Sequence, residues 1–151
     1  MKLKDFDFRI WDNIENKYIE TPHGLYIENT EHNDASNCNR IIANYEQRAF
    51  YIDYPFNDRN NEYYDNEESI SIELFTGLYD KKDKKVYEND IVKVKSLYDY
   101  FLAKISIHKE GTFYFEGKNG DYIGSLIYLV EDEGYTIEAI GNINENAELL
   151  K

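Results

Sequence analysis

The sequence predicts a mainly β protein with little helix, and three observations favour this fold class. Tyr and Phe are abundant, with 15 and 8 copies in 151 residues, and aromatic side chains suit the pleated surface of a sheet. Several short segments alternate apolar and polar residues, which is the period of a strand with one buried face. Turn residues separate these segments at short intervals, and this spacing is typical of a small barrel or sandwich.

The first predicted element is an N-terminal β-hairpin. Residues 6–11 alternate apolar and polar side chains and are expected to form its first strand. The segment 12–17 supplies turn chemistry through Asp and Asn side chains, and residues 18–19 begin the return strand. Within this hairpin Trp11 is expected to be a core aromatic, and the alternative is that it lines a ligand groove.

The next part of the chain has little periodicity and is predicted to be irregular. Residues 21–40 are polar and dense in Asn, Glu and Asp, and residues 57–69 are polar and acidic, so both favour surface loops. Residues 50–54 look extended, whereas the apolar residues before them lie at helical spacing: Ile41, Ile42, Tyr45 and Ala49. The pattern leaves helix and strand open over 41–54.

A domain boundary is expected where the pattern becomes regular again. Residues 1–69 hold the hairpin and an acidic region rich in Tyr and Asn, for which the alternatives to irregular structure are a domain insertion or disorder. Residues 70–151 are expected to form a small β-barrel domain. One integrated domain is the alternative to this division.

The C-terminal half carries most of the predicted strands. They are expected at 70–74, 86–87, 91–95, 101–107, 112–116 and 135–143. Turns are expected at 88–90 and at 118–121, where an Asn-Gly pair is a strong hairpin signal. Residues 126–132 fit a helical turn or a strand, and Asn146 is expected to cap a short helix that ends at Leu150.

Charge narrows the classes of partner. The chain has 17 Lys plus Arg against 30 Asp plus Glu, a net charge of −13, so phosphate backbones and anionic membranes repel it. The exception is the segment 80–95, which holds Lys81, Lys82, Lys84, Lys85, Lys93 and Lys95. We interpret this segment as a hairpin tip that protects a sheet edge. The alternative is a nucleic-acid contact through Lys81, Lys82, Lys84 and Lys85, with Tyr79 and Tyr87 as stacking partners.

The sequence offers no catalytic or metal site, so we predict neither an enzyme nor a cofactor. Cys38 is the single cysteine, which excludes an internal disulfide and fits a reducing cytosol. His32 and Cys38 share one polar loop, but their spacing does not match a zinc site, and His108 fits a surface position at a strand end. No apolar stretch has the length of a signal peptide or a membrane span, so no membrane association is expected.

Three blocks of sequence stand out along the chain. The first is Phe-Arg-Ile-Trp-Asp at 8–12. The second joins Thr-Gly-Leu-Tyr-Asp at 76–80 to Val-Tyr-Glu-Asn-Asp-Ile-Val at 86–92. The third is Glu-Ala-Ile-Gly-Asn-Ile at 138–143, followed by Asn-Ala-Glu-Leu-Leu at 146–150. Together, and in this order, the blocks resemble the YopX family of phage and prophage proteins.

The resemblance implies a largely β protein whose C-terminal part is an SH3-like barrel. It also implies phage or prophage origin and residence in the bacterial cytoplasm, but it supplies no reaction. The family positions, expected to be structural, are Trp11, Gly77, Tyr87, Asp90, Gly141 and Asn142. The family usually has Gly at the position of Asn89 and Pro at that of Ala147. Asn tolerates positive φ and Ala is a good helix former, so the turn and the helix are both expected to form.

These observations favour a non-enzymatic interaction module that binds a host or phage protein, with a homo-oligomer as a further possibility. A small β scaffold, many tyrosines and the lack of a catalytic constellation support this class, because Tyr is enriched at protein interfaces. Two alternatives stay open: a nucleic-acid-binding regulator that uses the Lys81–Lys95 segment, and an acidic DNA mimic that acts on a host protein. The net charge of −13 disfavours the first alternative and motivates the second.

Overall fold

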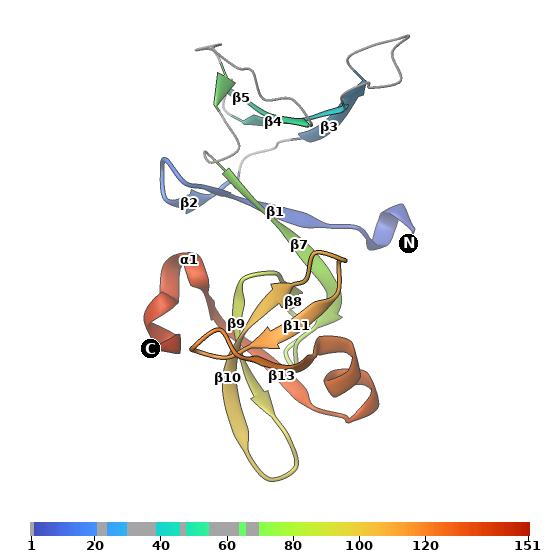
Figure 1. Ribbon diagram of the computed structural model, residues 1–151, viewed down its shortest axis with the longest axis vertical. Helices are drawn as coiled ribbons and strands as arrows, with labels where there is room; N and C mark the ends of the chain where they lie inside the picture. Colours follow the sequence, from blue (N-terminus) through green and yellow to red (C-terminus); the bar gives the residue numbers. More distant parts are fainter. Residues whose placement is uncertain (1, 21–23, 30–38, 46–47, 55–63, 66–69) are drawn as a thin grey trace. The chain divides into compact units, whose positions relative to one another are not determined.

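The computed structural model describes residues 2–20, 24–29, 39–45, 48–54, 64–65 and 70–151, and these are mainly β (Figure 1). The chain divides into two compact units. The first unit combines Met1–Arg9 with Glu73–Lys151, and the second is Ile10–Ile72. The predicted mainly β class is therefore confirmed for the part of the chain that the structure describes.

The predicted N-terminal hairpin is present. Its strands are β1 (Phe8–Asp12) and β2 (Lys17–Tyr18), and Trp11 lies opposite Tyr18 in their antiparallel register. The Asp12 carboxylate closes the turn, because its Oδ1 accepts hydrogen bonds from the N–H groups of residues 14 and 15 at 2.9 and 3.1 Å. Asn16 has a positive φ of 55°, which Asn tolerates better than most residues. Burial does not alternate along β1, however, because Asp12 is fully buried as the turn acceptor beside two buried apolar residues.

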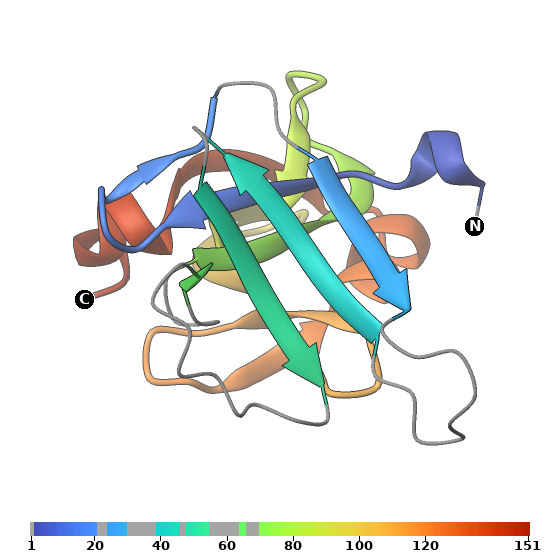
Figure 2. The same ribbon diagram turned by 90° about the horizontal axis from the view of Figure 1, so that it is seen from above.

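The rest of the second unit contains a sheet that the sequence did not predict. Its strands are β3 (Gly24–Asn29), β4 (Asn39–Tyr45), β5 (Arg48–Tyr54) and β6 (Tyr64–Asp65), in that order. The first three pair antiparallel and lie side by side in Figure 2, and β6 pairs parallel to β5.

The prediction of an irregular loop over 21–40 is wrong at β3 and at the start of β4. The helical spacing seen before residue 50 is misleading as well, because that segment is strand. The register explains both errors, since it places Ile27 opposite Ile41 and Ile41 opposite Ile52. β-branched residues favour strands when partners from distant segments pair with them, and a local pattern does not reveal such pairing.

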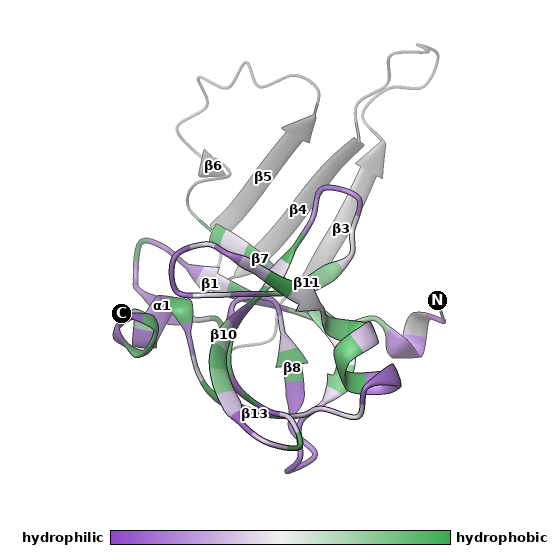
Figure 3. Cartoon of the chain, turned by 60° about the horizontal axis from the view of Figure 1, so that its bottom comes forward, coloured by the Kyte–Doolittle hydropathy of each residue, from purple (hydrophilic) through white to green (hydrophobic). Residues whose placement is uncertain are grey.

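The first unit is built from seven strands and a few short helical turns. After the 3₁₀ turn Leu3–Asp5, the strands are β7 (Ile70–Tyr79), which begins in the second unit, β8 (Lys85–Tyr87), β9 (Asp90–Lys95), β10 (Tyr100–Ile107), β11 (Phe113–Glu116), β12 (Tyr122–Ser125) and β13 (Thr136–Asn142). One sheet has the order β2-β1-β7-β8, and the other has the order β12-β11-β10-β9-β13. Apolar and polar positions are interspersed along these strands (Figure 3).

The core of the first unit lies between its strands and helical segment. Its buried members are Val86, Val92, Val94, Ala103, Ile105, Phe115, Leu126 and Ile137. The alternation predicted for β10 places Ala103 and Ile105 on the buried face, and the ring of Phe101 meets that of Phe115 edge to face at 6.0 Å. Full burial of one Val, Leu, Ile or Phe side chain stabilises the folded state by roughly 1.5–3 kcal/mol. This cluster is therefore the main source of apolar stabilisation in the unit.

All six predicted strands of the C-terminal half are present, and the structure adds to them in two places. Strand β7 continues through Tyr79, beyond the predicted end at residue 74, and β12 was not predicted. The segment left open at 126–132 is helical: a helical start at Leu126 is followed by the π-helical turn Tyr128–Asp132.

The predicted short helix that ends at Leu150 is present as a 3₁₀ turn with Asn146 at its N-cap position, but the predicted side-chain cap is not made. The helix α1 (Ile143–Asn146) begins after Asn142, whose side-chain oxygen accepts from the Glu145 N–H at 2.9 Å. A 3₁₀ turn, Ala147–Leu150, follows, and Asn146 makes no side-chain cap to it. Instead the Asn146 Oδ1 accepts from the Asn142 N–H at 3.1 Å. Asn142 has the extended backbone that an N-cap requires, which is why it takes this role.

Candidate functional site

Arg9 lies at the centre of a buried ion-pair network in the first unit. Its Nε is 2.6 Å from Oε1 of Glu73, and its Nη2 is 2.8 Å from Oδ1 of Asp90. The side chains of Glu73 and Asp90 are 0% and 5% exposed, so both carboxylates are removed from water. Buried charges require close partners, and here one guanidinium serves two carboxylates.

Backbone and amide groups complete the network. Asn89 and Asn144 each donate from Nδ2 to Oε2 of Glu73, at 2.8 and 2.9 Å. The Tyr87 N–H donates to Oδ2 of Asp90 at 2.9 Å, and Arg9 also reaches the carbonyl of residue 88 at 3.3 Å. The network therefore joins β1, β7, the turn between β8 and β9, and α1.

The turn at 88–89 positions two of these groups. Asn89 has a φ of 70°. In this conformation its side chain bonds to Glu73, and its backbone N–H and carbonyl both form hydrogen bonds. The Asn89 N–H donates to the Ile105 carbonyl at 2.8 Å, and its carbonyl accepts from the Ile143 N–H at 2.9 Å. One residue thus connects the turn to β10 and to the start of α1.

Burial dominates the electrostatics of the turn. It raises the pKa of Asp90, although Arg9 and the Tyr87 N–H favour the charged form. It also raises the pKa of Glu88, whose Oε2 accepts from the Leu74 N–H at 3.4 Å.

A second group of polar contacts surrounds Asp7. The hydroxyl of Tyr87 donates to Oδ2 of Asp7 at 2.6 Å, and Lys85 Nζ lies 2.8 Å from the same oxygen. Burial opposes ionisation of Asp7, but the hydrogen bonds from Lys85, Tyr87 and the Phe8 N–H outweigh it and lower its pKa. Burial and the Asp7 carboxylate raise the pKa of Tyr87. The guanidinium of Arg9 lies 4.8 Å from the centre of the Tyr87 ring, so the two groups of contacts adjoin.

Comparison with known proteins supports the family resemblance of the three sequence blocks at 8–12, 76–92 and 138–150. The model of the YopX protein family matches residues 7–151, which is nearly the whole chain. The chain belongs to the YopX family. No curated protein matches it.

Two solved structures resemble the chain. One is protein yopX from Bacillus subtilis, with 19% identity and a TM-score of 0.48, covering 95% of this chain and 97% of that one. The other is protein EF1440 from Enterococcus faecalis, with 23% identity and a TM-score of 0.49, covering 97% of this chain and 98% of that one.

The YopX blocks supply most residues of the network. Arg9 comes from the first block, Tyr87, Asn89 and Asp90 from the second, and Asn144 directly follows the third. Sequence reasoning named Tyr87 and Asp90 as structural positions but assigned no role to Arg9, Glu73 or Asn144. Arg9 and Glu73 are 64 residues apart, and opposite charge at polar strand positions was the one signal that pointed to them.

The remaining family positions have separate local roles. Trp11 is 6% exposed, and its ring meets that of Tyr18 edge to face at 4.9 Å. Gly77 has a φ of 88°, a conformation that suits glycine. Gly141 is required by crowding, because a Cβ there would lie 2.6 Å from Oδ1 of Asn146.

Three of the four lysines predicted as a nucleic-acid contact lie in ion pairs. Lys81 and Lys82 reach the two oxygens of Glu138 at 2.8 and 3.0 Å, and Lys85 reaches Asp7. The turn that carries them is fixed by the Asp80 carboxylate, which accepts backbone N–H groups from residues 82 and 84 and from Ala139 on β13. The lysine-rich turn at 80–85 therefore covers the outer edge of β13, where the Lys81 N–H also donates to the Ile137 carbonyl.

Within the described residues, no group of three or more His, Cys, Asp or Glu side chains is arranged to hold a metal ion. His108 stacks on the ring of Tyr114 at 4.1 Å, at the end of β10. His23, His32 and Cys38 lie outside the described residues. In the same described part of the chain, no helix is long and apolar enough to cross a membrane.

Proposed function

We propose that this YopX protein is a non-enzymatic protein-interaction module of phage or prophage origin that acts in the bacterial cytoplasm, on a small barrel of the SH3-like kind. The observation that carries the proposal is the contrast between its charged and its apolar side chains. The buried carboxylates of Glu73 and Asp90 pair with Arg9, and that of Asp80 is bonded to backbone N–H groups, whereas large apolar side chains of the first unit lie exposed. Surfaces of that kind serve binding rather than packing.

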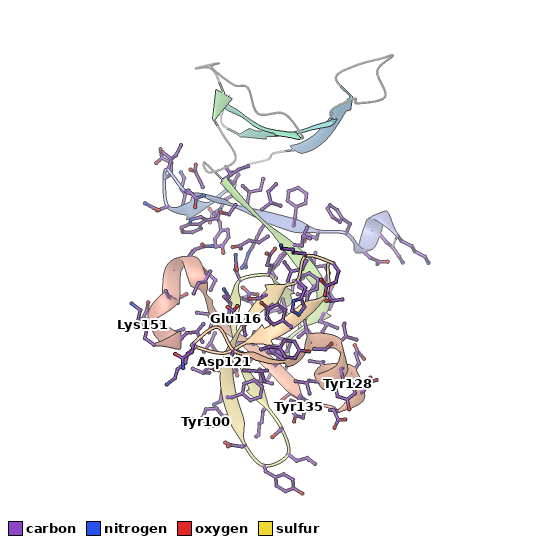
Figure 4. All side chains as sticks on the ribbon, viewed as in Figure 1. Tyr100, Glu116, Asp121, Tyr128, Tyr135 and Lys151 are labelled. Carbon is purple, nitrogen blue, oxygen red and sulfur yellow. The ribbon has the colours of Figure 1, made fainter. Side chains whose placement is uncertain are left out.

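Most of the exposed large apolar side chains of the first unit lie on three elements. These elements are the β9–β10 hairpin, β12 and the helical segment after it, with Leu97, Tyr98, Tyr100, Tyr122, Ile123, Ile127 and Tyr128. Phe6, Tyr79, Ile140 and Leu149 are exposed elsewhere in the unit. Figure 4 labels Tyr100 and Tyr128, which are 57% and 50% exposed. Tyrosine contributes a large contact area at a low cost in conformational entropy, so such a surface fits a protein partner.

The nucleic-acid alternative has less support. A lysine that already neutralises a carboxylate releases few counterions on binding phosphate, and Lys81, Lys82 and Lys85 are in this position. The net charge of −13 repels a phosphate backbone as well. The same net charge supports the DNA-mimic alternative. A DNA mimic is a specific case of protein binding in which the partner is basic.

An affinity pull-down tests the proposal. The tagged full chain is exposed to a lysate of the bacterium whose genome encodes it, with and without nuclease, and retained proteins are identified by mass spectrometry. We expect a stoichiometric protein that survives nuclease and that free untagged chain displaces. Partners that vanish with nuclease, and that the change of Lys81, Lys82, Lys84 and Lys85 to Ala also removes, would replace protein binding by nucleic-acid binding.

Self-association is measured in parallel by sedimentation equilibrium of the purified chain. If the chain itself is the stoichiometric protein, the partner is a second copy. If neither a second copy nor another protein is retained, the proposal is wrong.

A further inference from the structure

The tip of the β9–β10 hairpin carries the two most exposed large apolar side chains among the described residues. Leu97 and Tyr98 are 89% and 96% exposed. They lie between Ser96 and Asp99, where the Ser96 N–H donates to the Asp99 carbonyl at 2.9 Å. Figure 1 shows this hairpin projecting from the rest of the first unit.

Turn formation does not explain these two residues. The connection between β9 and β10 has four residues, 96–99, and loops of this length are most often built on a type I turn, which needs no positive φ and suits most residue types. Among the described non-glycine residues, positive φ occurs at Asn16, Asp83 and Asn89, so Leu97 and Tyr98 agree with such a turn but are not required by it. A Leu-Tyr pair at a turn also leaves apolar surface in water, and a small polar pair would form the turn better.

The tip is held in one conformation by its own hydrogen bonds. The hydroxyl of Ser96 donates to the Asp99 carbonyl at 3.1 Å, and the Asp99 N–H donates to that hydroxyl at 3.3 Å. The Tyr100 N–H donates to Oδ1 of Asp99 at 2.7 Å, and Lys95 pairs with Tyr100 in the strand register. A preorganised tip loses little entropy on binding, which favours affinity.

Two lysines, Lys93 and Lys95, flank the tip. Lys93 lies 4.3 Å from the centre of the Tyr100 ring, and Lys95 is exposed beside the turn. The structure gives no salt bridge to either lysine within the described residues, whereas Lys81, Lys82, Lys85 and Lys104 are all paired. Asp99 offsets one of the two lysine charges, so residues 93–100 carry a net charge of +1 on an otherwise acidic chain.

We propose that the β9–β10 hairpin inserts Leu97 and Tyr98 into an apolar pocket of a protein partner whose rim carries carboxylates. The inference rests on the proposed function and identifies its binding surface. Charge complementarity decides the partner: Lys93 and Lys95 attract an acidic rim. An anionic lipid surface would also attract them, but the net charge of −13 repels the rest of the chain from such a surface.

Two double variants of the full chain test the anchors and the charge, and two further double variants serve as their controls. Leu97→Ser with Tyr98→Ser removes the apolar tip, and Ile14→Ser with Tyr79→Ser removes an exposed aliphatic and an exposed tyrosine side chain that lie outside the proposed binding surface. Lys93→Glu with Lys95→Glu reverses the flanking charge, and Lys109→Glu with Lys118→Glu makes the same charge change at two other exposed lysines. Lys93 is half-buried and lies opposite Glu138, whereas the other replaced side chains are exposed, so the urea midpoint of each variant is measured and binding is compared where every variant is fully folded.

The probe is the protein retained after nuclease treatment, purified and measured by surface plasmon resonance. We expect the Leu97/Tyr98 variant to bind about 30-fold more weakly or worse, as for an interface hot spot, and the Ile14/Tyr79 variant to bind within about twofold of the unchanged chain. We expect the Lys93/Lys95 variant to associate about tenfold more slowly at low salt and its control within about twofold, with the difference lost at high salt.

The outcomes separate the two proposals. A partner that binds all variants equally overturns the hairpin and leaves the interaction module intact. If the Leu97/Tyr98 variant no longer binds the partner but both charge-reversal variants associate at the unchanged rate, the proposal that the pocket has an acidic rim is wrong. Retention of no protein overturns both proposals. Co-sedimentation of the unchanged chain with phosphatidylglycerol vesicles, lost in the Leu97/Tyr98 variant, would make the hairpin a membrane anchor and overturn the protein pocket.

Discussion

Asp80 shows how one carboxylate can fix a whole turn. Its side chain accepts the N–H groups of Lys82, Lys84 and Ala139 at 2.8, 2.9 and 3.0 Å, and the residue is 5% exposed. Burial raises the pKa of Asp80, but these three N–H donors outweigh it, and the net pKa lies below the usual 3.8. The folded state therefore favours the charged form more than the unfolded chain does.

Asp80→Asn is expected to lower the free energy of unfolding by about 1–3 kcal/mol at neutral pH, because the amide NH₂ replaces one acceptor oxygen. Since the folded pKa lies below the unfolded value, the stabilisation by the charged form is complete above pH 3.8 and disappears as pH falls through the folded pKa. Urea unfolding of both chains at several pH values measures the difference. A difference that grows as the solution is acidified would contradict this assignment.

Gly141 is a case of crowding rather than of unusual backbone. An added Cβ would approach Oδ1 of Asn146 to 2.6 Å, and that oxygen accepts the Asn142 N–H. Gly141→Ala is therefore expected to lower the free energy of unfolding by about 1–2 kcal/mol, through loss of this hydrogen bond. Asn146→Ala removes the obstacle, so the double variant should be no less stable than Asn146→Ala alone. Additive losses in urea unfolding would show that the crowding is unimportant.

At the scale of elements, the Arg9 network connects strands with a turn and a helix. Arg9→Met leaves Glu73 and Asp90 buried without their shared counter-charge, and we expect a loss of about 3 kcal/mol or more in the free energy of unfolding. A double-mutant cycle with Asp90→Asn isolates one pair, and the coupling should exceed about 1 kcal/mol. Hydrogen exchange of the N–H groups of Asn89 and Ile143 should accelerate in Arg9→Met. Unchanged exchange there would mean that the network does not hold the turn.

The predictability of the elements follows from the range of their contacts. Strands β9, β10 and β11 were predicted because each alternates locally and ends at a turn residue. Strands β3 and β4 were missed because their polar, Asn-rich segments become strands only through pairing with each other and with β5. The four-residue β12 is too short and too irregular to show a period.

The candidate site was less predictable than the strands. The blocks at 8–12, 86–92 and 138–143 were identified in the sequence. The local sequence of each block does not show that the three lie in contact in the folded chain. Arg9 and Asp90 are 81 residues apart, and Asn144 reaches Glu73 across 71 residues. The predicted cap at Asn146 failed for a related reason, since two asparagines four residues apart both suit an N-cap and only the end of β13 chooses Asn142.

At the scale of the whole molecule, the balance of charge is the dominant electrostatic property. Thirty acidic against 17 basic side chains give −13, and self-repulsion of that size favours expanded states. The surface ion pairs act in the opposite direction, but each contributes only about 0–1 kcal/mol and is also screened by salt. Repulsion among the many carboxylates acts over longer distances than the attraction within a single ion pair. Salt should therefore weaken the repulsion more than it weakens the ion pairs.

We therefore expect the chain to become more stable as NaCl rises from about 0.01 to 0.15 M, over which the Debye length falls from roughly 30 to 8 Å. The thermal midpoint measured by circular dichroism should rise by a few degrees, which corresponds to about 1 kcal/mol or less. The Lys109→Glu/Lys118→Glu variant has a larger net negative charge and loses no ion pair among the described residues, so its midpoint should rise more steeply with salt. A midpoint that falls with salt would mean that paired charges such as Lys104 with Glu116, 2.8 Å apart, outweigh the repulsion of the excess carboxylates.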